Sequence, residues 1–183
     1  MKAVAMRGLP ILLAAALAGC ASVTGGSDGG GVDVTRTHLG QVLARPQIAV
    51  EPGNAAASGT PEFRGFAAAV ERQLVRHGYS LAPNPAASEQ IARVSVQQGS
   101  RATLTSGWPA GLGRGSNRPN MVATLLDVRI QRRSDGTVFW QGRAVTEAPA
   151  DSPNAQPSVA VERLAEALFR DFPGESGRTI RVR

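Results

Sequence analysis

The sequence has 183 residues, and its 20 lysine and arginine side chains face 14 acidic ones, for a formal net charge of +6. The arginines are scattered along the chain and only eight residues are aromatic, so the composition excludes the basic and aromatic surface typical of nucleic-acid binding. A single cysteine, Cys20, excludes an internal disulfide and a cysteine cluster for a metal. We expect no nucleic-acid partner and no cofactor.

Residues 1–19 have the organisation of a secretory signal. Two cations, Lys2 and Arg7, precede an apolar run from Leu9 to Ala18, and small residues follow. The run is about ten residues long, whereas a membrane-spanning helix needs about 20. We therefore predict that residues 1–19 are removed, with an uncleaved N-terminal anchor helix as the alternative.

The run Leu17-Ala18-Gly19-Cys20 resembles the lipobox of bacterial lipoproteins. This resemblance implies cleavage before Cys20 and acylation of Cys20 with two or three fatty chains such as palmitate. Each buried methylene contributes about 0.8 kcal/mol, so such an anchor holds the protein on the membrane permanently. Ala21 follows Cys20, which in a Gram-negative host resembles the sorting signal for the outer membrane. We expect a lipid-anchored protein of the bacterial cell envelope that faces the periplasm.

Residues 20–31 are predicted to be the lipidated cysteine and a glycine-rich tether, and residues 32–183 one domain. Alternating or short apolar runs predict extended segments throughout this domain. The turn signal Ser134-Asp135-Gly136 joins two of these segments into a hairpin. The predicted extended segments are 32–39, 47–51, 79–81, 90–98, 121–130, 138–145 and 178–183.

Two helices are predicted between these segments. The first begins after Thr60, which can cap it, and ends at Gly78. The second spans 158–172 and is stopped by Pro173. Each helix has one apolar stripe, and the hairpin strands alternate, so one face of the sheet should be covered. The expected fold class is α+β, a two-layer sandwich of a mostly antiparallel sheet with two helices on one face.

The two tryptophans are the candidate partner contacts. Trp108 lies in a long predicted loop, 99–120, and loops of this length are usually functional or mobile. If exposed, Trp108 can contact a protein or a membrane. Trp140 lies in the second hairpin strand, either as a ligand platform or as part of the core. Gly142 beside it lets another group approach closely, and this group can be the second helix.

The sequence contains no pattern that defines a reaction. In principle His38 can join Asp127 and a serine, Ser95 or Ser106, but no nucleophile-elbow pattern surrounds a serine. The two histidines are distant from each other, and the acidic residues occur singly, so no metal site is expected. The glycines at 111–115 lack the spacing of a dinucleotide fingerprint. We therefore expect no catalytic residues and a protein that is not an enzyme.

Five segments in a fixed order resemble the bacterial lipoproteins grouped as domain of unknown function 4136. The strand pattern Trp140-x-Gly142-x-Ala144 and the helix-ending Phe172-Pro173 are the most usable marks. The resemblance covers about residues 32–183, and it implies an envelope lipoprotein of α+β fold without supplying an activity or a ligand. The five segments are 34–40, 48–52, 126–130, 139–144 and 169–177.

Two functional hypotheses follow. The first is a non-catalytic, lipid-anchored module that binds another envelope component, through the 99–120 loop or by strand addition at an uncovered sheet edge. The alternative is a small-ligand or lipid-binding accessory protein for envelope transport. That alternative requires an apolar pocket between the helices and the sheet, or under the 99–120 loop.

We predict that the Cys20→Ala variant keeps a folded domain but leaves the membrane. Removing the thiol removes the only site at which the resemblance implies acylation. Circular dichroism checks the fold, and fractionation in high salt checks the attachment. A variant that still sediments with membranes in high salt would contradict lipid anchoring at Cys20.

Overall fold

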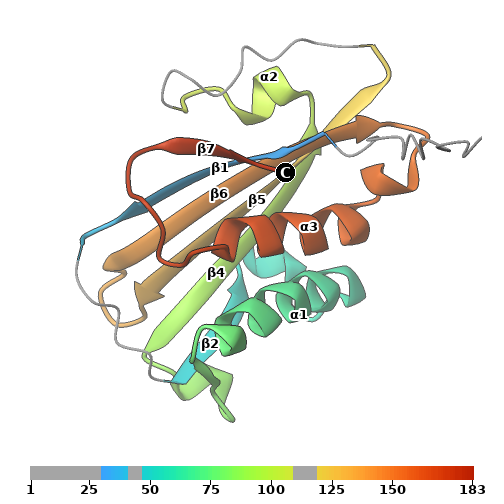
Figure 1. Cartoon of the computed structure of the whole chain (residues 1–183). Coiled ribbons are helices and arrows are strands. Elements are labelled where there is room, and N and C mark those ends of the chain that lie inside the picture. Colours follow the sequence, from blue (N-terminus) through green and yellow to red (C-terminus); the bar gives the residue numbers. More distant parts are fainter. Residues whose placement is uncertain (1–29, 41–46, 109–118) are drawn as a thin grey trace, which may run out of the picture.

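The computed structural model describes residues 30–40, 47–108 and 119–183 (Figure 1). The predicted signal segment, the lipidation site Cys20 and all but the last two residues of the tether therefore lie outside the described residues. The same holds for residues 109–118 of the predicted 99–120 loop.

Within the described ranges, seven strands form one open sheet in the order β3-β2-β4-β5-β6-β1-β7. Strand β2 pairs in parallel with β3 and β4, and every other pairing is antiparallel. The strands are β1 (Val32–His38), β2 (Gln47–Pro52), β3 (Ser80–Leu81), β4 (Gln90–Gly99), β5 (Met121–Arg132), β6 (Val138–Pro149) and β7 (Thr179–Val182).

Two long helices, α1 (Pro61–Arg76) and α3 (Pro157–Phe169), lie side by side on one face of the sheet (Figure 1). This arrangement confirms the predicted α+β fold class. A short helix, α2 (Arg101–Leu104), lies on the opposite face, within the segment predicted as a loop. Ser100 caps this helix, and four residues are too few for a periodic apolar stripe in the sequence. In the described part of the chain, three single 3-10 turns also connect elements, at η1 (Ala55–Ala57), η2 (Pro85–Ala87) and η3 (Pro153–Ala155).

Helix α1 begins and ends as the sequence predicts. The hydroxyl oxygen of Thr60 accepts a hydrogen bond of 3.2 Å from the backbone N–H of Phe63, which satisfies one of the unpaired donors at the helix start. Gly78 follows the last turn with a φ of 86°, the left-handed conformation that favours glycine. Local sequence signals are therefore sufficient to predict where this helix begins and ends.

Helix α3 ends at Phe169, three residues earlier than predicted, because a side chain from β1 caps its last turn. The guanidinium of Arg36 donates to the carbonyl oxygens of Leu168 at 2.8 Å, Ala167 at 3.0 Å and Arg170 at 2.7 Å. These carbonyls have no partner within the helix. Burial lowers the pKa of Arg36 from its ordinary value, and an arginine so capped still carries its charge at neutral pH.

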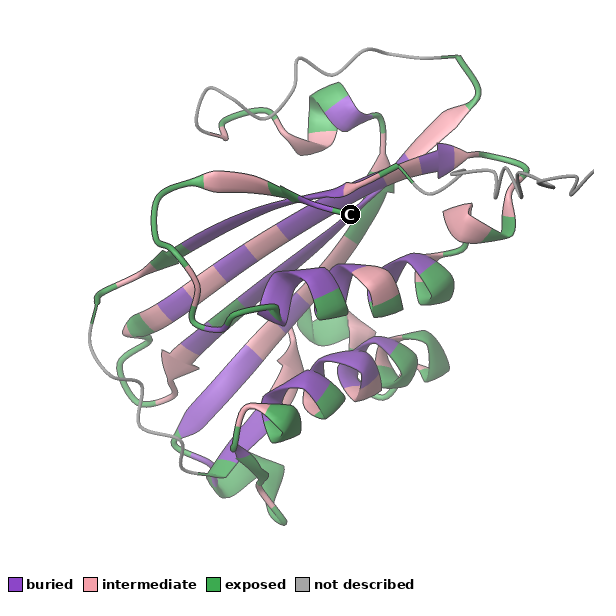
Figure 2. Cartoon of the chain, viewed as in Figure 1, coloured by how far each residue is buried: buried purple, intermediate pink, exposed green. Residues whose placement is uncertain are grey.

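The hydrophobic core lies between the sheet and the two long helices (Figure 2). Trp140 is fully buried there, with its ring centroid 5.4 Å from that of Phe169 and 5.1 Å from that of Phe172. Its indole N–H donates to the carbonyl oxygen of Pro173 at 2.9 Å. The prediction of a partner contact at Trp140 is therefore wrong, because this side chain has no exposed surface, and the core alternative is correct.

Other groups lie close to the backbone of β6 at Gly142, as the glycine at this position suggested. Helix α3 is one of these groups. A Cβ at Gly142 would lie 2.7 Å from Cδ1 of Leu168 and would also collide with the ring of Trp140. Glycine at this position therefore lets α3 pack directly on the sheet beside the tryptophan.

We predict opposite effects for two glycine-to-alanine substitutions. Gly142→Ala should lower the free energy of unfolding by about 1–3 kcal/mol, because the added methyl group overpacks the core. Gly65→Ala should raise it by about 0.5–1 kcal/mol, because Gly65 is exposed within α1 and no atom lies within 4 Å of the added Cβ. Urea denaturation measures both changes, and a neutral Gly142→Ala variant would contradict the described packing.

Candidate binding site on the open face of the sheet

The face of the sheet opposite α1 and α3, here called the open face, carries rows of polar and charged side chains. Because side chains alternate along each strand, residues paired across strands share a face. One row of paired residues crosses β2, β4, β5 and β6 as Glu51, Arg93, Arg129 and Gln141. The next row crosses β4, β5, β6 and β1 as Ser95, Asp127, Arg143 and Thr35.

A pocket of about 510 Å³ lies on this face, between β4, β5 and the segment that contains α2. We call it the open-face pocket. Its charged lining consists of three arginines and one aspartate, and its apolar lining comes from α2, β5 and Trp108. The full lining is Gly53, Arg93, Ser95, Gln97, Thr103, Leu104, Ser106, Trp108, Leu125, Asp127, Arg129 and Arg143.

A small second core forms the apolar wall of this pocket. Leu125 and Val145 are buried on the open face, and Leu104 and Trp108 pack against them. The Trp108 ring is half-buried, and the guanidinium carbon of Arg143 lies 5.8 Å from its centroid, within cation–π range. The structure thus places Trp108 at the pocket, while its predicted role as a partner contact stays a prediction.

A buried ion pair holds α2 on the sheet. Arg101, with 6% of its side chain exposed, donates to the carboxylate of Asp33, which is 9% exposed. The second terminal nitrogen of Arg101 lies 3.5 Å from a carboxylate oxygen of Glu147, and Arg181 contacts Asp33 at 3.3 Å from the solvent side. A charge at this depth is stable only when paired, so the pair fixes the position of α2.

The carboxylate of Asp127 orients two of the pocket arginines. One oxygen accepts hydrogen bonds from Nε of Arg143 at 2.7 Å and from the amide of Gln141 at 2.9 Å. The other oxygen accepts from Nε of Arg129 at 3.2 Å. Both guanidinium groups are therefore held at Nε by one acceptor, which restricts their rotation.

The residues considered for a catalytic triad do not come together. Ser95, Ser106 and Asp127 line the open-face pocket, but His38 does not join them. The imidazole of His38 lies 2.9 Å from the carbonyl oxygen of Gly174 and accepts from the backbone N–H of Gly40 at 3.1 Å. Asp127 bonds to Gln141, Arg129 and Arg143 instead of a histidine, so the geometry of base and orienting carboxylate is missing at this pocket.

Among the described residues, no three histidine, cysteine, aspartate or glutamate residues come together as a group that could hold a metal ion. Within the same ranges, no helix is both long enough and apolar enough to cross a membrane.

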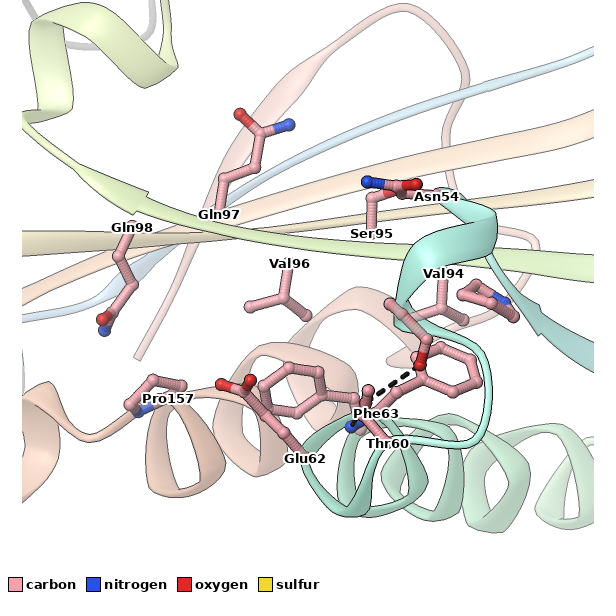
Figure 3. A pocket seen from close by; sticks show the side chains of 13 residues that line it. Asn54, Thr60, Glu62, Phe63, Val94, Ser95, Val96, Gln97, Gln98 and Pro157 are labelled. Atoms are coloured by element: carbon pink, nitrogen blue, oxygen red, sulfur yellow. Dashed lines mark hydrogen bonds between the residues drawn. The ribbon is translucent and has the colours of Figure 1, made fainter.

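A second cavity of about 510 Å³, the helix-side groove, lies where α1 begins, beside β4 (Figure 3). Its apolar lining includes Phe63, Phe66 and Val96, and Figure 3 shows Glu62 and Gln98 among the polar residues around it. Strand β2 pairs with β4 only as far as Val94, so beyond this point the β4 edge that bears the groove has no neighbouring strand among the described residues.

The sequence comparison finds one relative of moderate similarity. An uncharacterized protein of Zymomonas mobilis subsp. mobilis is 25% identical to this chain, over 83% of this chain and 80% of that protein. No family model matches the chain. The resemblance to domain of unknown function 4136 therefore stays a prediction.

Solved structures with a related architecture share little sequence with this chain. A PDZ domain protein of Parabacteroides distasonis has a TM-score of 0.52 at 9% identity, and the match covers 85% of this chain and 40% of that one. This likeness supports the fold alone. The PelC dodecamer protein of Paraburkholderia phytofirmans has a TM-score of 0.45 at 15% identity, with 75% of this chain and 94% of that chain covered.

A more distant structural neighbour is a candidate lipoprotein of Caulobacter crescentus. Its TM-score is 0.33 at 17% identity, over 68% of this chain and 82% of that chain. A similarity this low supports no argument about the site.

We predict that two arginines bound to the same carboxylate differ sharply in their contribution to stability. Arg101→Gln should lower the free energy of unfolding by about 3–5 kcal/mol, because it breaks the buried pair with Asp33. Arg181→Gln should cost about 0–1 kcal/mol, because Arg181 is 57% exposed and solvent screens its charge.

Urea denaturation measures both variants, and acrylamide quenching reports the exposure of Trp108. In Arg101→Gln we expect greater quenching, since α2 no longer has its buried partner. Equal costs for the two variants would contradict the assignment of Arg101 as the residue that holds α2.

Proposed function

We propose that this protein is a lipid-anchored protein of the bacterial cell envelope that binds another envelope component without catalysing a reaction. Cys20 is the proposed lipidation site, and the outer membrane, with the domain facing the periplasm, is the proposed location. The lipobox resemblance and Ala21 support this part of the proposal.

The observation that carries the proposed binding role is the open-face pocket. Its wall is a short helix held by the buried Arg101–Asp33 pair, and Trp108 packs beside that helix. The Arg101–Asp33 pair that holds this four-residue helix over the sheet buries two charges. The desolvation penalty cancels most of their attraction, so the pair contributes little net stability. We infer that its role is to preform a binding site, since rigid binding surfaces lose less entropy on association.

The arrangement around Asp127 supports a binding role over a catalytic one. Its two oxygens accept from three side chains, and two of these are arginines whose Nε positions it fixes. A carboxylate so engaged acts as a positioning group. Trp108 and the polar groups of the pocket then serve as contacts for a partner.

The second candidate function is a small-ligand or lipid-binding accessory protein for envelope transport. The helix-side groove favours it, because Phe63, Phe66 and Val96 line a cavity between the helices and the sheet. A volume of about 510 Å³ falls within the range of small-molecule sites.

Capture from intact envelopes tests the proposal. We expect crosslinking and affinity purification of the wild-type lipoprotein to recover a reproducible protein partner. Cys20→Ala should lose the partner because it leaves the membrane. Trp108→Ala should reduce recovery by about tenfold or more, since truncating an aromatic contact residue typically costs at least about 2 kcal/mol.

Val159→Ala is the matched control, because it truncates an exposed apolar side chain on α3, away from the open-face pocket. Recovery should be unchanged in this variant. Failure to recover any reproducible protein would contradict the proposal. A co-purifying lipid or small molecule whose recovery depends on Phe63 would instead favour the second candidate function.

A further inference from the structure

We propose that the open-face pocket binds a carboxylate side chain of an acidic peptide segment that also carries apolar residues. This inference rests on the proposed binding function and specifies the chemistry of the partner. Three features of the pocket support it: the arginine pair at Asp127, the net charge of that group and the apolar wall beside it.

Two arginines of the pocket keep free hydrogen-bond donors. Arg129 and Arg143 each use Nε to bond to Asp127. A guanidinium has five N–H donors, so four remain on the terminal nitrogens of each residue. Within the part of the chain that the structure describes, these terminal nitrogens have no hydrogen-bond partner. Asp127 thus holds both guanidinium groups in place. The paired N–H donors on the two terminal nitrogens of each group, here called its fork, remain available to a ligand.

The charge of the pocket favours a monovalent anion. Its third arginine, Arg93, lies 3.7 Å from Glu51, which offsets its charge. Arg129, Arg143 and Asp127 then leave a net charge of +1. A single carboxylate of charge −1 neutralises this group and matches the fork geometry with two parallel hydrogen bonds. A phosphate carries about −1.5 to −2 charges, and would leave an uncompensated negative charge at this triad. The triad therefore favours a carboxylate.

An apolar wall borders these arginines. Leu104, Trp108 and Leu125 line the same cavity as the arginines. A carboxylate of a peptide can bond to the forks while a neighbouring apolar residue packs on Trp108. The neutral side chains of Ser95, Gln97 and Thr103 also line the pocket, and they can bond to peptide backbone groups.

Peptide binding to the full-length lipoprotein in detergent micelles tests the inference. The probes are a fluorescein-labelled peptide of alternating glutamate and leucine, the same peptide with glutamine in place of glutamate, and the same with phosphoserine. Fluorescence anisotropy gives the affinities. We expect the glutamate peptide to bind about tenfold or more tightly than the glutamine peptide, since charge-assisted hydrogen bonds are lost in the latter.

Two charge-conserving variants test the role of the forks. Arg143→Lys and Arg129→Lys keep the charge but lose the fork and the Nε bond to Asp127, so each should weaken binding of the glutamate peptide by about tenfold. Arg64→Lys, at an exposed position on α1, is the matched control and should bind like the wild type. Circular dichroism confirms that all variants are folded.

Three results would overturn the inference: equal or absent binding of the glutamate and glutamine peptides, wild-type affinity in both pocket variants, or tighter binding of the phosphoserine peptide. If envelope capture depends on Trp108 while the glutamate peptide shows no preference, the carboxylate inference fails and the proposed function stands. If the peptide results hold and no envelope partner is captured, the proposed function fails instead.

Discussion

The buried ion pair between Arg101 and Asp33 is the interaction on which the candidate site depends. It ties α2 to β1, and through Glu147 also to β6, across the open face of the sheet. Without it, Leu104 and Trp108 would have no fixed position over Leu125 and Val145, and the open-face pocket would lose its wall. Such a pair contributes little net stability, and we infer that its role here is to fix one arrangement, because an unpaired partner cannot remain buried.

The two faces of the sheet differ in the side chains that they carry. The face toward α1 and α3 buries Trp140, Phe169 and the aliphatic core, where Gly142 lets the helix approach. The open face carries its charges in rows. Arginines placed opposite each other, such as Arg93 and Arg129, lie next to the carboxylates of Glu51 and Asp127. Strand alternation alone produces this division, since neighbouring residues along a strand point to opposite faces.

Local patterns in the sequence predict most of the fold but few of the interactions that form the candidate site. The Thr60 cap, the Gly78 stop and the hairpin turn are local signals, and they predicted α1, β5 and β6. The early end of α3 was missed because Arg36, which caps it, lies 132 residues from Leu168 in the chain. Asp33 and Arg101 are 68 residues apart, and no pattern in one sequence links them. The long irregular segment that contains Trp108 indicates this residue as a candidate contact, whereas the sequence suggests Asp127 only as a member of a catalytic triad.

Site-specific photo-crosslinking in intact envelopes tests most directly the claim that the open face binds a partner. A photoreactive amino acid at Ser106, on the open-face pocket, should crosslink one defined envelope protein. The same amino acid at Arg76, exposed near the end of α1, should give no such product. A crosslinked partner from Arg76 and none from Ser106 would contradict the account.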